Sequence, residues 1–244
     1  MYWLVQKLKV SETRARATGM FTKELWRYPV KSLAGERLQS GEVGSLGLKG
    51  DRTVHIEVAR RVITARTHFK LLGLAGTTGA DGTPLINGFA WDSPEALKLV
   101  HQAAGQNAEI AYYDGPERFD ILPLLVATDG AIDAFGHDSR RLRPNIVIGG
   151  VSGLEERNWP GQMLRVGEVL IGIRDLRGRC VMTTYDPDTQ EQNPRVLREI
   201  VAKFNGDLAL NCFVLRGGTI REGDQVELLP LGLPNGDPPE SRSR

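Results

Sequence analysis

The spacing of glycines limits what the first third of this chain can fold into. Between residues 25 and 74 the sequence contains only short strand-like runs, and the predicted strands cover 38–43, 52–58 and 61–65. The residues that interrupt these runs are Gly41, Gly44, Gly47 and Gly50. Runs this short and this often interrupted favour a small β-barrel or sandwich.

Two helices are predicted from their boundary signals. The first covers 93–105, where Ser93 serves as N-cap and a proline follows at the first helical position. The second covers 193–204, where Asn193 is again followed by proline. Apolar residues form one stripe on each helix, so each helix is expected to pack one face against a core.

Three further segments indicate β structure after the first helix. Residues 145–148 and 166–173 are predicted strands, and 217–226 alternates around a glycine turn as a closing hairpin does. The predicted fold class is therefore α+β and dominated by β structure. The helices are expected at the periphery.

The chain is predicted to form two domains with non-globular ends. A β-barrel-like domain is expected over 20–115 and a second β-barrel domain, with the peripheral helices, over 116–229. Residues 1–19 are predicted to be a flexible extension. Residues 230–244 are rich in proline and lack aromatic residues, so they are predicted to be a disordered tail.

Composition excludes several kinds of partner and cofactor. A net charge of +1 over 244 residues gives no reason to expect nucleic acid or an anionic membrane as partner. The apolar run at the N-terminus is too short for a signal sequence or a membrane span, so a cytoplasmic location is expected. The two cysteines form no C-x-x-C pair, which argues against a zinc site or an iron–sulfur cluster built from thiolates of this chain.

Cys180 has the most distinctive chemical surroundings in the sequence. Arg177 and Arg179 precede it on either side of Gly178, and nearby positive charge favours the thiolate, the form that binds metals. The alternative is that Cys180 is a small buried hydrophobe, as many free cysteines are. Cys212 lies in an apolar run and is expected in the core; parity allows a disulfide between the two, but nothing indicates secretion.

Several motifs, in order, resemble the MOSC domain family. These are Tyr-Pro-Val-Lys-Ser at 28–32, Gly-Asp-Arg at 50–52, Ile-Thr-Ala-Arg at 63–66, Arg-Pro-Asn-Ile at 143–146 and Arg-Cys-x-x-Thr-Thr-x-Asp-Pro at 179–187. The resemblance covers roughly residues 20–229. It is closest to proteins in which a MOSC N-terminal β-barrel domain precedes the MOSC domain, such as the mitochondrial amidoxime-reducing component and its bacterial relatives.

This resemblance implies a molybdenum-molybdopterin cofactor. Cys180 would be the catalytic residue and the metal ligand, because a soft thiolate suits molybdenum. The cofactor phosphate and polar pterin need cations and hydrogen-bond donors, and the matching positions are Lys31, Ser32, Arg52, Arg143, Asn145 and Arg179. Taken singly, each of these cations could equally be a solvated surface charge.

One departure from the family pattern concerns the same cofactor. Amidoxime-reducing members carry Asp-Thr-Ser-Pro where this chain has Asp-Ile-Leu-Pro at 120–123. Two hydroxyl groups that contact the cofactor in those members are therefore replaced by apolar side chains at Ile121 and Leu122. Gly178 likewise replaces a serine.

The implied activity is reduction of small N-hydroxylated compounds, namely amidoximes, hydroxylamines and hydroxylated bases. Since the chain has no G-x-G-x-x-G or P-loop motif, electrons are expected from a separate flavin or iron–sulfur reductase. One alternative is a cofactor carrier or sulfur-relay protein without reductase activity, and another is a structural protein with an inert cysteine. Family-level descriptions also mention pyridoxal phosphate, but no lysine lies in a recognisable motif for it.

Overall fold

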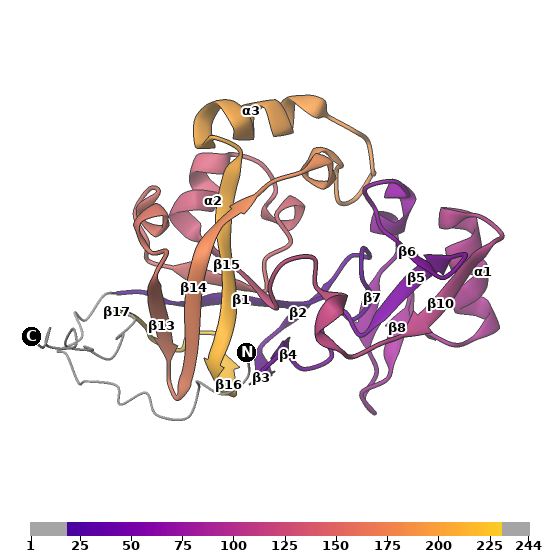
Figure 1. Ribbon diagram of the computed structural model, residues 1–244, viewed down its shortest axis with the longest axis horizontal. Coiled ribbons are helices and arrows are strands. Elements are labelled where there is room, and N and C mark those ends of the chain that lie inside the picture. The colour runs from indigo at the N-terminus through magenta and orange to yellow at the C-terminus, as the bar shows by residue number, and fades with distance from the viewer. Residues whose placement is uncertain (1–18, 231–244) are drawn as a thin grey trace, which may run out of the picture.

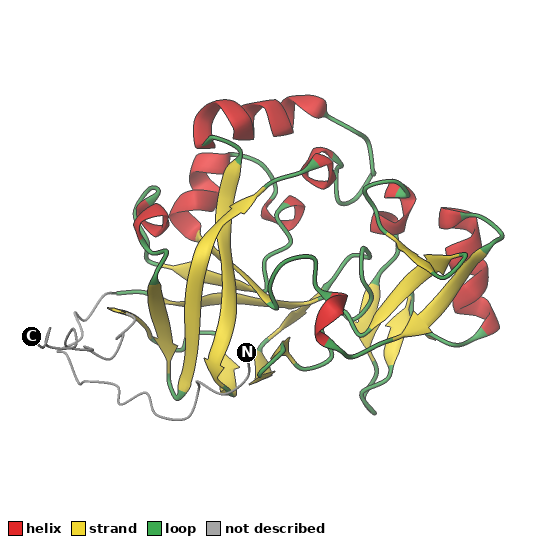
Figure 2. Cartoon of the chain, in the orientation of Figure 1, coloured by secondary structure: helices red, strands yellow, loops and turns green. Residues whose placement is uncertain are grey.

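The computed structural model describes residues 19–230, and β structure dominates it (Figures 1 and 2). The predicted extension at 1–19 and tail at 230–244 lie outside the described residues, except for their inner ends, Gly19 and Pro230. The α+β, β-dominated class is confirmed. None of the helices between residues 19 and 230 is long and apolar enough to cross a membrane.

The largest sheet has eight strands and combines both ends of the described chain. Its order is β17 (Val226–Pro230), β13 (Gln162–Val166), β14 (Val169–Gly178), β15 (Asp207–Arg216), β11 (Leu124–Thr128), β12 (Ile146–Gly149), β1 (Phe21–Arg27) and β2 (Glu36–Leu38). Its neighbouring strands are antiparallel except for β11 and β12, which are parallel and are connected through α2 (Asp129–Phe135). Because β1 and β2 join the later strands, the domain boundary expected near residue 115 stays a prediction.

Three small sheets complete the β structure of residues 19–230. One has the order β10 (Ala108–Tyr112), β5 (Val54–Val58), β6 (Arg61–Ile63); another is β16 (Gly218–Arg221), β3 (Ser40–Gly44), β4 (Gly47–Leu48); the last is β7 (Gly76–Thr78), β8 (Pro84–Ile86), β9 (Phe89–Ala90). Five short 3₁₀ helices link these elements: η1 (Phe69–Gly73), η2 (Pro116–Arg118), η3 (Ser139–Arg141), η4 (Glu155–Asn158) and η5 (Val181–Thr184).

The predicted barrels do not close. The eight-stranded sheet ends at β17 on one side and at β2 on the other. Only the turn before β17 reaches β1, through an isolated bridge between Phe21 and Gln225 and a hydrogen bond from the Thr22 N–H to the Asp224 carbonyl at 2.8 Å. The predicted closing hairpin at 217–226 is also wrong, because β16 pairs with β3 whereas β17 pairs with β13.

Both predicted helices form where their caps indicate. In α1 (Pro94–Ala104) the Ser93 hydroxyl accepts a hydrogen bond from the Ala96 N–H at 3.1 Å. In α3 (Pro194–Phe204) the Asn193 side chain accepts one from the Arg195 N–H at 3.1 Å. Such contacts satisfy backbone donors that have no partner within the helix.

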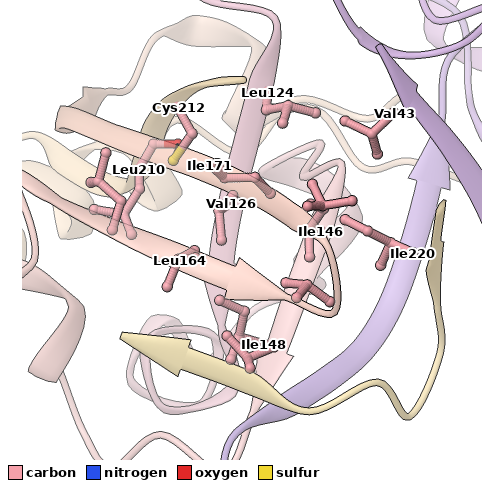
Figure 3. Close-up of a cluster of buried hydrophobic side chains, with 14 of the residues drawn as sticks. Val43, Leu124, Val126, Ile146, Ile148, Leu164, Ile171, Leu210, Cys212 and Ile220 are labelled. Carbon is pink, nitrogen blue, oxygen red and sulfur yellow. Dashed lines mark hydrogen bonds between the residues drawn. The ribbon is translucent and has the colours of Figure 1, made fainter. Parts of the chain in front are cut away.

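Two separate apolar clusters support the two ends of the molecule. The main cluster lies on the eight-stranded sheet and joins Val43 from the first part of the chain with Leu124, Ile146 and Ile220 from later strands (Figure 3). A second cluster packs α1 on β5 and β10. Cys212 lies in the main cluster with no exposed surface, which confirms its predicted place in the core.

A third cluster fixes the chain just before the Arg-Pro-Asn-Ile motif. It packs α2 against α3 and includes Leu142, which is 1% exposed. Because Leu142 is held between these two helices, the following residue, Arg143, leaves the core at a defined place. The packing of peripheral helices thus positions a residue of the candidate site.

Candidate functional site

All seven sequence-predicted site residues line one cavity of about 100 Å³. They come from four segments far apart in sequence and comprise Lys31, Ser32, Arg52, Arg143, Asn145, Arg179 and Cys180. The segments after β1, before β5 and before β12 supply five of them, and the segment after β14 supplies Arg179 and Cys180. The cavity therefore lies where the first and last parts of the chain meet.

Cys180 sits in a short turn that the neighbouring threonine fixes. The Arg179 N–H donates to the Gly206 carbonyl at 2.8 Å, which ties the end of β14 to β15. The Cys180 carbonyl then accepts from the Thr183 hydroxyl at 2.8 Å and from the Thr183 N–H at 3.1 Å. Cys180 itself is half-buried and is a free thiol, as is Cys212. No disulfide joins them.

Two buried arginines beside Cys180 have donors without a partner. Arg179 donates from Nη2 to the Leu142 carbonyl at 2.8 Å, but its Nε and Nη1 are buried and bonded to nothing in residues 19–230. Arg143 has a buried, unpartnered Nη2. Burial lowers the pKa of each guanidinium to about 10. Buried donors of this kind are costly unless a ligand accepts their hydrogen bonds.

Arg177 adds a third guanidinium without a carboxylate partner in the described chain. Its Nη1 donates to the Asn211 side-chain oxygen at 3.3 Å. Burial lowers the pKa of Arg177, and the charges of Arg52 and Arg66 act in the same direction. The three arginines give the cavity an excess of positive charge next to Cys180. An anion is the ligand that would offset it.

Lys31 is already engaged within the protein. Its Nζ lies 2.7 Å from Asp120 Oδ1 and donates to the Arg118 carbonyl at 2.9 Å. Arg66 binds the other Asp120 oxygen at 2.7 Å. Burial alone would raise the pKa of Asp120, but hydrogen bonding and charge from Lys31, helped by Arg66 and Arg177, hold it below its usual value. Lys31 thus reaches the cavity with its charge largely neutralised.

Ser32 and Asn145 connect the walls of the cavity. The Ser32 hydroxyl accepts a hydrogen bond from the Ala65 N–H at 3.0 Å. The Asn145 side-chain oxygen accepts from the Leu125 N–H at 3.1 Å, and its Nδ2 donates to the Trp26 carbonyl at 3.3 Å. Both side chains are buried. Their assignment to cofactor binding stays a prediction, whereas their contacts show that they hold β1, β11 and the loop after β6 together.

Three of the predicted residues have left-handed backbone conformations. The φ angles are 73° at Ser32, 55° at Arg52 and 56° at Arg143. Non-glycine residues rarely adopt such angles, and they concentrate where the surrounding structure holds a functional side chain in place. The strain at these positions is consistent with a site whose cations are fixed before a ligand binds.

Part of the cavity lining is apolar. We call Phe119, Ile121, Leu122 and Met182 the apolar wall, and Ile121 is 43% exposed. Ile121 and Leu122 are the residues that replace hydroxyl-bearing residues of the resembling proteins. This chain therefore presents carbon rather than hydroxyl groups on that wall.

Sequence reasoning missed Asp120, Arg66 and Arg177 as site residues. Arg66 ends the Ile-Thr-Ala-Arg motif and Arg177 precedes Cys180, so both carried a signal that could have been used. The pairing of Asp120 with Lys31 spans 89 residues in sequence and had no local signal. None of the four histidines lines this cavity in the structure; His137 contacts Glu199 at 2.9 Å instead.

Two family models match this chain in adjacent segments. The MOSC N-terminal beta barrel domain matches residues 20–97, and the MOSC domain matches residues 130–227. The chain is a MOSC domain protein. The cavity of this MOSC protein takes residues from both matched segments, with Lys31 and Arg52 from the first and Arg143 and Cys180 from the second.

Its curated relatives include two human proteins. Mitochondrial amidoxime reducing component 2 is 34% identical over 95 residues, and the match covers 34% of this MOSC protein and 24% of the relative. The chain thus spans only about a quarter of that relative's length. Mitochondrial amidoxime-reducing component 1 is 24% identical over 283 aligned positions, which cover 84% of this chain and 82% of the relative.

Solved structures with some likeness to this MOSC protein come from bacteria. The YUAD protein of Bacillus subtilis has a TM-score of 0.49 and 13% identity, covering 87% of this chain and 97% of that one. YiiM from Escherichia coli has a TM-score of 0.39 and 13% identity, covering 83% and 69% respectively. Both TM-scores lie below 0.5, so nothing is inferred from these likenesses.

Proposed function

We propose that this MOSC protein binds a molybdenum cofactor in the cavity beside Cys180 and reduces N-hydroxylated compounds. The observation that carries the proposal is the position of a half-buried cysteine next to the unpartnered donors of Arg143 and Arg179. These residues fit the cofactor, because a phosphate would accept hydrogen bonds from the buried guanidiniums and a thiolate is a ligand that molybdenum accepts.

Each group of the cavity then has a role. Cys180 would hold the metal, and Arg143, Arg177 and Arg179 would hold the anionic parts of the cofactor. Asp120 binds Lys31 and Arg66 and keeps them in place. When bound, the cofactor supplies two-electron reduction that removes the oxygen of an N–OH group as water. The electrons would come from a separate flavin or iron–sulfur reductase. The relatives are named amidoxime-reducing components, and the word component supports a system of more than one protein.

The apolar wall supports a restriction on substrates. Phe119, Ile121, Leu122 and Met182 offer surface for an aromatic or aliphatic body and no side-chain hydroxyl. A substrate in this cavity would place its N–OH group toward Cys180 and its apolar part on this wall, since contact with carbon surface is favourable there.

The test is metal content and turnover of protein made in a host that synthesises molybdopterin. We expect about one molybdenum per chain, loss of molybdenum in Cys180→Ala, and retention in the matched control Cys212→Ala, whose sulfur lies in the core. Benzamidoxime should be reduced to benzamidine with reduced viologen as electron source. Full metal content in Cys180→Ala would eliminate the proposal.

The same preparation tests the alternative of a cofactor carrier or sulfur relay. The replacement of two hydroxyl residues by Ile121 and Leu122 is the observation that favours it, because the relatives named for reduction carry hydroxyls there. Bound cofactor or a persulfide on Cys180, together with no reduction of any N-hydroxylated compound, would support that function instead.

A further inference from the structure

A second and larger cavity lies on the small sheet formed by β10, β5 and β6. Its volume is about 380 Å³. Helix α1 lies beside this sheet (Figure 1). Ile56 and Ala108 belong to the apolar cluster that includes α1, whereas His55, Glu57 and Ala111 of the same strands line the cavity. The short helix η2 supplies Glu117 and Arg118 to the lining on that second face. The sheet is therefore closed on one side and hollowed on the other.

The N–H donors of the basic residues in this cavity are already engaged by protein atoms. Lys31 lines it, but its ammonium is bound to Asp120 at 2.7 Å. The Arg118 guanidinium is directed to backbone carbonyls, with Nε donating to Asp51 at 2.9 Å and Nη2 donating to Leu46 at 3.2 Å. Nη1 also donates to the carbonyls of Asp114 and Gly115. Both side chains are thus bound to other parts of the protein that surround the cavity.

Two carboxylates, Glu57 and Glu117, also line this cavity. Glu57 comes from β5, with Oε1 2.7 Å from His55 Nε2. Glu117 comes from η2 and accepts a hydrogen bond from the Tyr113 hydroxyl, which lowers the pKa of this glutamate. Glu57 also lies directly opposite Glu109 on β10, so the negative charge along this face is not confined to the cavity.

Aromatic surface completes the opening. Tyr113, which follows β10, lines the cavity and is 40% exposed. Tyr112 borders the cavity too, but it pairs with Val54 of the core side, and its ring centroid lies 6.0 Å from that of Trp91, which packs against the α1 cluster. Aromatic faces attract cations electrostatically, and Val62 and Ala111 supply apolar surface beneath a flat ligand. Carboxylates beside aromatic rings form an environment that favours a flat organic cation over an anion or a neutral molecule of the same shape.

We propose that this cavity is a binding site for a planar amidinium or guanidinium cation, held between Glu57 and Glu117 and against the ring of Tyr113. Such a cation donates two parallel N–H groups to one carboxylate and stacks on an aromatic ring. The inference does not depend on the function of the Cys180 cavity. If that proposed function holds, an amidine formed from an amidoxime belongs to the same class of ligand.

Three ring compounds of equal shape test the site. Benzamidine is a cation, benzamide is neutral and benzoate is an anion, and each is titrated into the full-length protein by calorimetry. Since hydrogen bonds between charged groups are stronger than neutral ones, we expect the Kd for benzamidine to be at least about tenfold lower than that for benzamide, with no measurable binding of benzoate. Equal affinity for benzamidine and benzamide would overturn the proposal.

Matched variants place the ligand. Glu57→Gln and Glu117→Gln should each weaken benzamidine binding by about five- to tenfold, whereas Glu95→Gln, on α1 at the other side of the same layer, should leave it unchanged. Tyr113→Phe keeps the ring and should retain most of the affinity, while Tyr113→Leu should lose about threefold or more. Tyr113 and Glu117 are exposed and Glu57 is partly exposed, so the variants should fold. Benzamidine binding that is unchanged in the Glu57→Gln, Glu117→Gln double variant would refute the site.

Discussion

The guanidinium carbon of Arg143 lies 4.3 Å from the centroid of the Tyr28 ring. The guanidinium carbon of Arg52 lies 5.1 Å from the same centroid. Tyr28 is 3% exposed, its hydroxyl donates to the Pro144 carbonyl at 3.2 Å, and burial raises its pKa to about 12. One neutral, buried ring therefore holds two like charges close together at the edge of the candidate site. The tyrosine of the Tyr-Pro-Val-Lys-Ser motif is a positioning residue.

Replacing this ring is expected to weaken anion binding. Tyr28→Leu removes both cation–π contacts, so the affinity for inorganic phosphate measured by calorimetry should fall by about three- to thirtyfold. Tyr28→Phe keeps the ring and should change that affinity less than about twofold, although loss of the hydrogen bond to Pro144 should lower the free energy of unfolding by about 1 kcal/mol. Equal phosphate affinity in the two variants would show that the ring does not position the arginines.

Arg143→Met is expected to stabilise the protein when no anion is present. The buried guanidinium has a donor without a partner, and its charge is penalised by burial, so a neutral side chain of similar length removes both costs. The free energy of unfolding in urea should rise by about 1–2 kcal/mol, and phosphate should no longer stabilise the variant. Arg198→Met, at an exposed position on α3, is the control and should change stability by less than about 0.5 kcal/mol. A destabilised Arg143→Met protein would contradict this account.

The helices could be predicted from sequence because their signals are local. Ser93 and Asn193 each cap a helix through a bond to a residue two or three positions later. The strand that pairs with β16 could not be predicted. Gly218 pairs with Val43, and no pattern within 217–226 contains that information. Helix α2 was missed because seven residues are too few to show an apolar stripe.

The set of residues that line the candidate site could be predicted, because the motif residues come together at one cavity. Cys180 and six predicted partners line one cavity, as the ordered motifs implied. The direction of each polar group was not predictable, because it depends on neighbours that folding supplies. The Asn145 side chain, for example, forms hydrogen bonds with the backbone of Leu125 and Trp26, and the Lys31 ammonium forms an ion pair with Asp120. The residues with free donors, Arg143 and Arg179, stand out only once those contacts are known.

Asp120→Asn should reduce stability only at pH values where the aspartate is ionised. The folded pKa of Asp120 is held below the unfolded value of about 3.9, so the ion pairs contribute fully above that value and are lost as the pH falls through the folded pKa. The wild type should be more stable than Asp120→Asn by about 1 kcal/mol at pH 6, since the groups are partly exposed, and the difference should vanish near pH 2.

The same variant should bind phosphate more tightly at pH 7. Without the Asp120 carboxylate, the positive charges of Lys31 and Arg66 are no longer offset and can attract an anion. The affinity for phosphate is expected to increase about three- to tenfold. Asp92→Asn, an exposed aspartate with no ion pair among the described residues, is the control for both measurements. Weaker phosphate binding by Asp120→Asn would show that this carboxylate orders Lys31 for the ligand rather than neutralising it.

The two thiols should differ sharply in reactivity toward Ellman's reagent. Cys212 has no exposed surface and burial raises its pKa far above the usual value, whereas Cys180 is half-buried in a cavity lined by cations. One thiol should therefore react in the native protein and two in guanidinium chloride, and the native reaction should disappear in Cys180→Ala. Because the reagent is a dianion, the rate at Cys180 should fall as salt rises, while the rate with a neutral aromatic disulfide should change little. Equal salt dependence for the two reagents would show that the arginines around Cys180 create no net attraction for anions.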